Sequence, residues 1–285
     1  EKPHRIAEYL EKLREWLKKQ PHLQHKMENQ DLLAFLRGTK WSFLLSTQKI
    51  DNFYTLRSLM PDFFESRDPL SEDVRSIFQS GAITPILSNG CSVEPVAIVF
   101  QFTDAVQSLS FNTTFKAFFM TIDILMKQED HAVISGFKIV SDYSLMRPGF
   151  ALMFSPTIVR NFIICIQNVY PIRMKQFIGL NTPKVIETIY NTLVTPFLSD
   201  KLKHRFHFTS ESEWIDSDNG LVRSLENLVN GRSLKELSDD WCNKIESLRD
   251  WFLENDDYVF DENLRPRKPQ PELGVDGSFR KLSID

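Results

Sequence analysis

The sequence lacks the features that mark secreted, membrane-spanning and disulfide-rich proteins. Its three cysteines, Cys91, Cys165 and Cys242, form neither a CxxC pair nor an even disulfide framework. It has no stretch of about 18 consecutive apolar residues, and its charged N-terminus is unlike a signal peptide. These absences favour a reducing compartment, so we expect a cytoplasmic protein. Because Glu1 is not a methionine, we also expect further residues upstream.

An excess of positive charge and the common catalytic signatures are missing too. The net charge is −4 and the isoelectric point about 5.9, so the chain as a whole offers no basic field to nucleic acid. The sequence contains no G-x-S-x-G nucleophile elbow, no G-x-G-x-x-G loop and no Walker loop. Neither His22 with His25 nor His204 with His207 has carboxylates or thiolates at metal-ligand spacing. We therefore expect no enzyme, no metal and no cofactor.

Phenylalanine, by contrast, is abundant. The 285 residues include 23 phenylalanines, against 5 tryptophans and 6 tyrosines. Phenylalanine brings a large apolar surface and no polar group, which suits both an apolar cavity and an ordinary core. The length allows one large domain with a smaller one attached.

Helical patterns dominate the start of the chain. Residues 5–20 have one apolar face, and two more helices are expected within 29–60. The charged segment that ends at Pro69 is interpreted as a linker. We expect three regions: a helical lobe at 1–69, a second domain at 70–232, and a C-terminal helix (Ser233–Leu253) with an extended tail at 233–285.

Beyond the linker, apolar strand patterns alternate with helical ones. The expected strands are Ile83–Leu87, Val96–Phe102, Ala132–Val140, Arg173–Leu180 and Arg205–Phe208. The Asn89–Gly90 pair predicts a turn between the first two. One helix is expected at Phe111–Lys127, and another begins where Ser155 caps and Pro156 opens it. Such alternation predicts an α/β domain with a largely parallel sheet.

The stretch from Tyr170 to Phe206 carries the strongest signal. After a strand, Asn181–Pro183 interrupts the pattern, and apolar residues then recur at helical spacing up to Pro196. The apolar face of this helix is Val185, Ile186, Ile189, Tyr190, Leu193 and Val194. Basic residues lie on both sides of it. An apolar stripe is usually core and a basic group is usually solvated, but an apolar helix framed by cations also suits a carrier that meets anionic lipid.

This order of elements resembles the CRAL-TRIO (Sec14-like) family of lipid-binding proteins, in particular its tocopherol transfer protein and retinaldehyde-binding protein branch. In that branch, a strand with the pattern aromatic-Pro-aliphatic-basic-x-basic leads through Asn-x-Pro into a mobile gate helix, and a Pro-Phe-Leu run follows. The matching residues are Tyr170–Lys175, Asn181–Pro183 and Pro196–Lys203. The ending Gly274–Leu282 resembles that of arthropod members. The resemblance implies a helical lobe followed by an α/β/α lipid-binding domain whose gate helix covers a pocket.

The resemblance also implies a ligand pocket. The positions that match the pocket lining of that branch are Phe119, Asp123, Phe137, Phe154, Phe162, Cys165, Ile166, Phe177, Val185, Ile186 and Ile189. Asp123 is the one charged member; it is expected either to accept a hydrogen bond from a ligand hydroxyl or to point to solvent.

The same resemblance implies that Arg173, Lys175, Lys201 and Arg205 bind a phosphoinositide headgroup, with Lys203 and Lys40 nearby. Several phosphates need several converging cations.

Together these features predict a monomeric lipid-transfer protein in the cytoplasm. It would bind a tocopherol-, retinoid-, carotenoid- or phospholipid-like molecule and exchange it during transient contact with phosphoinositide-containing membranes. The alternative is a lipid-sensing or regulatory Sec14-like module that acts through a protein partner.

Overall fold

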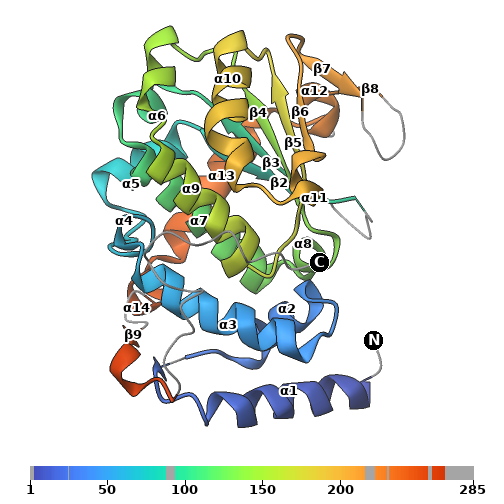
Figure 1. Cartoon of the computed structure of the whole chain (residues 1–285). Helices are drawn as coiled ribbons and strands as arrows, with labels where there is room; N and C mark the ends of the chain where they lie inside the picture. The colour runs from blue at the N-terminus through green and yellow to red at the C-terminus, as the bar shows by residue number, and fades with distance from the viewer. Residues whose placement is uncertain are drawn as a thin grey trace.

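The computed structural model describes residues 3–24, 26–87, 94–215, 222–229, 231–255 and 259–266. At its centre is a five-stranded sheet in the order β2-β3-β4-β5-β6 (Figure 1). The strands are β2 Ile83–Ile86, β3 Val96–Gln101, β4 Phe137–Asp142, β5 Met174–Leu180 and β6 Phe206–Phe208. The first pair is antiparallel and the other three pairs are parallel. The predicted α/β class with a mostly parallel sheet is therefore confirmed.

Helices cover the sheet face that looks toward the main core. These helices are α7 Phe111–Gln128, α9 Pro156–Ile164 and α10 Lys184–Ile189, with α5 Glu72–Gln79, α6 Asp104–Ser108 and α8 Asp130–Ser135 around them. The start of α9 follows from its sequence, because the Ser155 hydroxyl accepts a hydrogen bond from the Ile158 amide at 3.2 Å. The short helix η1 Pro148–Met153 lies between β4 and α9 in the chain.

A smaller apolar cluster covers the other face of the sheet. Trp214 packs there against Val99, Val140 and Ile178 of the central strands. The elements on this side include β7 Glu213–Ile215, β8 Val222–Ser224, α12 Leu225–Leu228 and α13 Leu234–Ser247. Because both faces are covered, the central strands are almost continuously apolar.

The N-terminal helices form a separate layer at one end of the sheet, at the bottom of Figure 1. They are α1 Pro3–Leu17, α2 Asn29–Gly38 and α3 Phe43–Ser58. The C-terminal part returns to this layer through α14 Arg249–Asn255, β9 Val259–Phe260 and η5 Glu262–Leu264, and β9 pairs with β1 Leu23–Gln24. Arg265 then donates to both carboxylate oxygens of Asp51 on α3, at 3.0 Å each.

Two contacts hold the helical layer tightly to the segment before β5. A Cβ atom placed on Gly38 would lie 2.1 Å from the carbonyl oxygen of Pro171, so only glycine allows this approach. The Lys49 ammonium donates to the carbonyl oxygens of Gln167 and Tyr170, at 2.9 and 2.6 Å. Gln167 lies in the π-helical turn η2, Cys165–Val169, which ends α9, and Tyr170 directly follows this turn.

The structure corrects two sequence-based expectations about secondary structure. Ala132–Val140 is not one strand, because Asp130–Ser135 forms α8 and β4 begins only at Phe137. Gly136 separates the two with φ of 86°, and short apolar runs do not distinguish a helix from a strand. Ser233–Leu253 is likewise two helices, which meet at Leu248.

The segment that precedes Pro69 is not an exposed linker. Residues Pro61–Phe64 form helix α4, and both Phe63 and Phe64 are buried. Arg67 is only 1% exposed. The predicted turn at Asn89–Gly90 and the tail at Gly274–Leu282 lie outside the described residues. Within the described ranges, no helix combines the length and the apolar character needed to cross a bilayer.

A gated apolar cavity and an adjoining basic cluster

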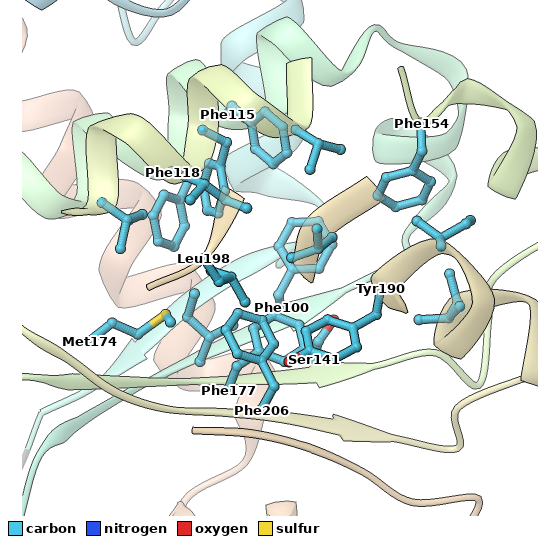
Figure 2. A pocket seen from close by; sticks show the side chains of 18 of the residues that line it. Phe100, Phe115, Phe118, Ser141, Phe154, Met174, Phe177, Tyr190, Leu198 and Phe206 are labelled. Carbon is cyan, nitrogen blue, oxygen red and sulfur yellow. The ribbon is translucent and has the colours of Figure 1, made fainter. Parts of the chain in front are cut away.

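A cavity of about 140 Å3 lies between the sheet and the helices that cover it. The sheet contributes Phe100, Ile139, Ser141, Met174, Phe177 and Phe206. The helices opposite contribute Phe115 and Phe118 from α7, Phe162 and Ile166 from α9 and η2, and Ile186 and Ile189 from α10. Figure 2 shows these side chains converging with hardly an oxygen among them. No lysine, arginine or histidine of the described residues lines the cavity.

Aromatic rings make much of the cavity wall. Phe177 of β5 stacks on Phe206 of β6 with ring centroids 4.9 Å apart, and Tyr190 stacks on Phe206 at 5.0 Å. On the helical side, Phe115 of α7 stacks on Phe162 of α9 at 4.4 Å. Rings of this kind offer a broad apolar surface to a ligand without demanding hydrogen bonds.

We call residues 184–197 the gate segment. It consists of α10, the π-helical turn η3 Tyr190–Val194 and the short η4 Thr195–Phe197. Of these residues only Ile186 is fully buried, whereas Val185 is 43% exposed. The gate segment thus presents a narrow apolar edge to the cavity and is otherwise half-buried or exposed. Irregular helical turns of the π type often occur at functional sites.

Two side chains fasten the gate segment: Gln167, which lies outside it, and Tyr190, which belongs to it. The Gln167 amide nitrogen donates to the Phe197 carbonyl at 2.9 Å, and its oxygen accepts from the Ser199 amide at 3.1 Å. The Tyr190 hydroxyl donates to the Lys203 carbonyl at 3.2 Å. These hydrogen bonds fasten the end of the gate segment and the residues that follow it.

Six of the eleven predicted pocket residues line this cavity. They are Phe154, Phe162, Ile166, Phe177, Ile186 and Ile189. The other five do not. Phe137 and Cys165 are fully buried beside the cavity, with the Cys165 sulfur 3.4 Å from that of Met60, and Val185 points outward.

Phe119 and Asp123 lie on the side of α7 that faces away from the cavity. Phe119 stacks on Tyr170 with ring centroids 5.4 Å apart and planes inclined by 3°. Cavity positions on α7 are instead Phe111, Phe115 and Phe118, one face of the helix at i, i+4 and i+7. That periodicity is the signal that could have corrected the assignment, because Phe118 and Phe119 differ by about 100° around the helix.

Asp123 does not line this cavity and does not point to solvent. It is 2% exposed and accepts from Arg57 at 2.9 Å, from Arg67 at 2.7 Å and from the Tyr170 hydroxyl at 2.8 Å. Burial raises the pKa of Tyr170 well above its ordinary value, so the phenol remains a donor. The cluster therefore joins α3, the segment before Pro69, α7 and the segment before β5.

The predicted basic residues gather where β4, β5 and β6 begin. Gly136, at the start of β4, has room for no Cβ, because that atom would lie 2.4 Å from the Arg173 carbonyl oxygen and 3.1 Å from the Lys175 side chain. Burial, and then the charge of Arg173, lower the pKa of Arg205. The side chains of Arg173 and Arg205 thus bring like charges to the same end of the sheet.

The rest of the basic cluster lies on a neighbouring helix. Lys201 is exposed on α11 Asp200–Lys203, whereas Lys203 is paired with Asp200 at 2.9 Å. Arg173 also donates to the Ile134 carbonyl and Arg205 to that of Met174.

Several cavity residues were missed from the sequence. They include Phe100, Phe102, Ser141, Tyr143 and Gln167. Strand alternation carries part of this information, since Phe137, Ile139 and Ser141 share one face of β4. Gln167 gave no sequence signal, because its role depends on the close approach of Phe197 and Ser199, which lie some thirty residues further along the chain.

A mostly parallel sheet that floors an apolar cavity, covered by a short irregular helix, defines a binding protein for a small hydrophobic molecule. The model of the CRAL/TRIO domain matches residues 94–236, half of the chain. The chain therefore belongs to the CRAL-TRIO family, whose members bind hydrophobic lipids. Residues 2–74 match the model described as Pinta-like, UBA domain.

Known relatives are similar to most of this chain. The alpha-tocopherol transfer protein-like protein of Homo sapiens is 26% identical over 229 residues, which are 79% of this chain and 65% of that protein. Clavesin-1 of Xenopus laevis is 21% identical over 206 residues, 72% of this chain and 61% of that protein. The chain thus spans less than two thirds of the length of these relatives. Among solved structures, that of Sfh5 aligns with a TM-score of 0.46 at 12% identity, over 65% of each chain.

Metal ligands are not grouped in the parts of the chain that the structure describes, where no set of three or more His, Cys, Asp or Glu could hold an ion.

Proposed function

We propose that this chain is a lipid-transfer protein that encloses one hydrophobic molecule beneath the gate segment and exchanges it at a membrane. The observation that carries the proposal is the apolar cavity with few polar groups in its wall. Burial of a lipid there yields about 25 cal/mol per Å2 of apolar surface, or roughly 10 kcal/mol for about 400 Å2, before the entropy costs of binding. Such a carrier makes and breaks no covalent bonds.

Loading requires the gate segment to move. The cavity of about 140 Å3 is close to the roughly 150 Å3 of an engineered apolar cavity that admits benzene. A tocopherol- or retinoid-sized molecule is several times larger, so aromatic rings or the gate segment must be displaced. The gate segment is the better candidate, because all of it except Ile186 is half-buried or exposed, and the Gln167 side chain attaches its Phe197 carbonyl to the cavity wall.

The membrane side of the cycle is assigned to the basic cluster. We propose that Arg173, Lys175, Lys201 and Arg205 bind the phosphates of a phosphoinositide headgroup. Mutual repulsion of Arg173 and Arg205 supports this role, since an anion between them relieves it. Lys201 lies only a few residues beyond the gate segment, so a headgroup bound at Lys201 acts on the segment that must move when the cavity opens.

Two measurements test the proposal. Native mass spectrometry of the purified chain should find an apolar compound bound one to one, and vesicle-to-vesicle transfer of that compound should accelerate when phosphoinositide is present. Lys201→Glu should keep the bound compound but weaken vesicle binding about 30-fold, because about 1 kcal/mol is lost for each unit of charge. Lys18→Glu, at an exposed lysine just after α1, is the matched control and should change little.

A chain that stays empty and takes up no lipid from vesicles would refute the carrier and turn attention to the regulatory alternative. Equal vesicle binding by Lys201→Glu and Lys18→Glu would refute the headgroup assignment alone.

A further inference from the structure

The polar side chains of the cavity form two pairs, of which one fastens the gate segment and the other does not. Of the 24 lining residues, Ser141, Tyr143, Gln167 and Tyr190 carry a polar side-chain group. Gln167 and Tyr190 are engaged in holding the gate segment and its continuation, through the hydrogen bonds to the carbonyls of Phe197 and Lys203 and from the Ser199 amide. Ser141 and Tyr143 take no part in that attachment.

Ser141 and Tyr143 form a hydroxyl pair at the end of β4. Ser141 is 2% exposed and lies on the same strand face as Ile139, toward the cavity. The Tyr143 ring stacks on Phe102 at 4.8 Å and lies against Gly179, where a Cβ atom would come within 3.2 Å of it. Burial raises the pKa of Tyr143 to about 12, and the neighbouring Ser141 side chain offsets part of that shift. The pair is therefore uncharged and held in place by its neighbours.

This hydroxyl pair has hydrogen-bonding capacity left over. Two hydroxyls offer two donors and several acceptor lone pairs. Among the described residues, the structure shows no hydrogen bond from either hydroxyl to a group outside the pair. A buried polar group with unused capacity is costly in an otherwise apolar wall, unless a bound molecule satisfies it.

We propose that the Ser141–Tyr143 pair binds the polar end of the lipid and selects an uncharged hydroxyl or carbonyl group over a carboxylate or a phosphate. This inference rests on the proposed function, that the cavity holds a lipid. Its second support is the absence of lysine, arginine and histidine from the cavity wall within the described chain. An ionised group brought to this pair would be buried without a counter-ion. An alcohol can both donate and accept hydrogen bonds there, and an aldehyde can accept one.

Matched alcohols and acids on two carbon skeletons test the selection. Full-length protein is offered vesicles containing hexadecanol or palmitic acid, and retinol or retinoic acid, at pH 8, and uptake is measured by native mass spectrometry. We expect each alcohol to bind at least about 100-fold more tightly than its acid. Methyl palmitate, which has the carbonyl but no charge, should bind like the alcohol.

Variants then locate the effect. Ser141→Ala with Tyr143→Phe should weaken alcohol binding about tenfold or more and shrink the preference for alcohol over acid. Ser144→Ala, an exposed serine just beyond the pair, is the control and should match the unmodified chain.

The outcomes separate the two levels of the proposal. Equal binding of alcohols and acids, or unchanged alcohol binding by the double variant, would overturn the assignment of the hydroxyl pair while lipid carriage stands. Failure to bind either skeleton, together with a purified chain that carries no lipid, would overturn the proposed function and this inference with it.

Discussion

Replacing Asp123 by asparagine should destabilise the fold without acting on a ligand. The change keeps the shape of the side chain but removes the negative charge that lies between Arg57 and Arg67, both at most 7% exposed. Both buried guanidiniums would then lose the Asp123 carboxylate as their acceptor. The Tyr170 hydroxyl, which donates to Asp123 at 2.8 Å, would face a neutral amide instead. Breaking a buried ion pair by removing one partner costs about 3–5 kcal/mol.

Urea unfolding followed by tryptophan fluorescence measures this loss. The free energy of unfolding of Asp123→Asn should fall by about 3–5 kcal/mol. The control is Asp104→Asn, which removes the carboxylate of an exposed pair with Arg147 and should cost less than about 1 kcal/mol. Lipid uptake per folded molecule should be the same in both variants, because neither Asp104 nor Asp123 lines the cavity.

Two results would refute the reasoning about the cluster. One is an Asp123→Asn protein as stable as Asp104→Asn, which would mean that the buried charges are compensated elsewhere. The other is a loss of lipid affinity with unchanged stability, which would return Asp123 to the pocket. A triple variant, Asp123→Leu with Arg57→Met and Arg67→Met, should recover much of the lost stability, since apolar replacements avoid the desolvation of the charges.

Three further predictions concern contacts of the helical layer and of the gate segment. Gly38→Ala should lower the free energy of unfolding by about 1–3 kcal/mol or more, because the added methyl group would overlap Pro171, whereas Gly149→Ala, with nothing nearby, should be tolerated; equal effects would contradict the close approach. Burial lowers the pKa of Lys49 to about 8, below its unfolded value, so the unfolded state binds more protons between pH 8 and about 10.5. The stability of the unmodified chain should therefore rise relative to Lys49→Met across that range, and a fall measured by urea unfolding would contradict the sign. Gln167→Leu should speed lipid release several-fold in a vesicle assay, because the end of the gate segment loses two hydrogen bonds, and an unchanged rate would show that these bonds do not limit opening.

The parts of this fold that local sequence determines could be predicted. The cap at Ser155, the strand before Asn181 and the helix after Pro183 are specified within a few residues, and each lies where the sequence predicts it. Ala132 and Val133 show the limit of such reasoning, because their apolar character suits a strand and a buried helix equally.

The Asp123 cluster could not be predicted, for a different reason. Its partners Arg57 and Arg67 are 66 and 56 residues away in the sequence, and no spacing rule connects residues at such separations. The same holds for the choice between Phe118 and Phe119 as a cavity residue, which depends on the rotation of α7 between the sheet and the helical layer. The pocket residues that the resemblance implies but that do not line the cavity lie on α7, on β4, in η2 and in the gate segment, where the rotation of each element decides which side chain faces inward.

The helical layer and the gate segment are connected through the π-helical turn η2 at the end of α9. Lys49 on α3 binds the main-chain carbonyl of Gln167 at 2.9 Å, while the side chain of the same residue holds the Phe197 carbonyl and the Ser199 amide. A shift of α3 therefore moves the group that fastens the gate segment. Because Asp51 on the same helix is paired with Arg265, the C-terminal part of the described chain also bears on that helix. The helical layer thus contacts the residue that fastens the gate segment. From the proposed function, we expect removal of this layer to alter lipid retention as well as stability.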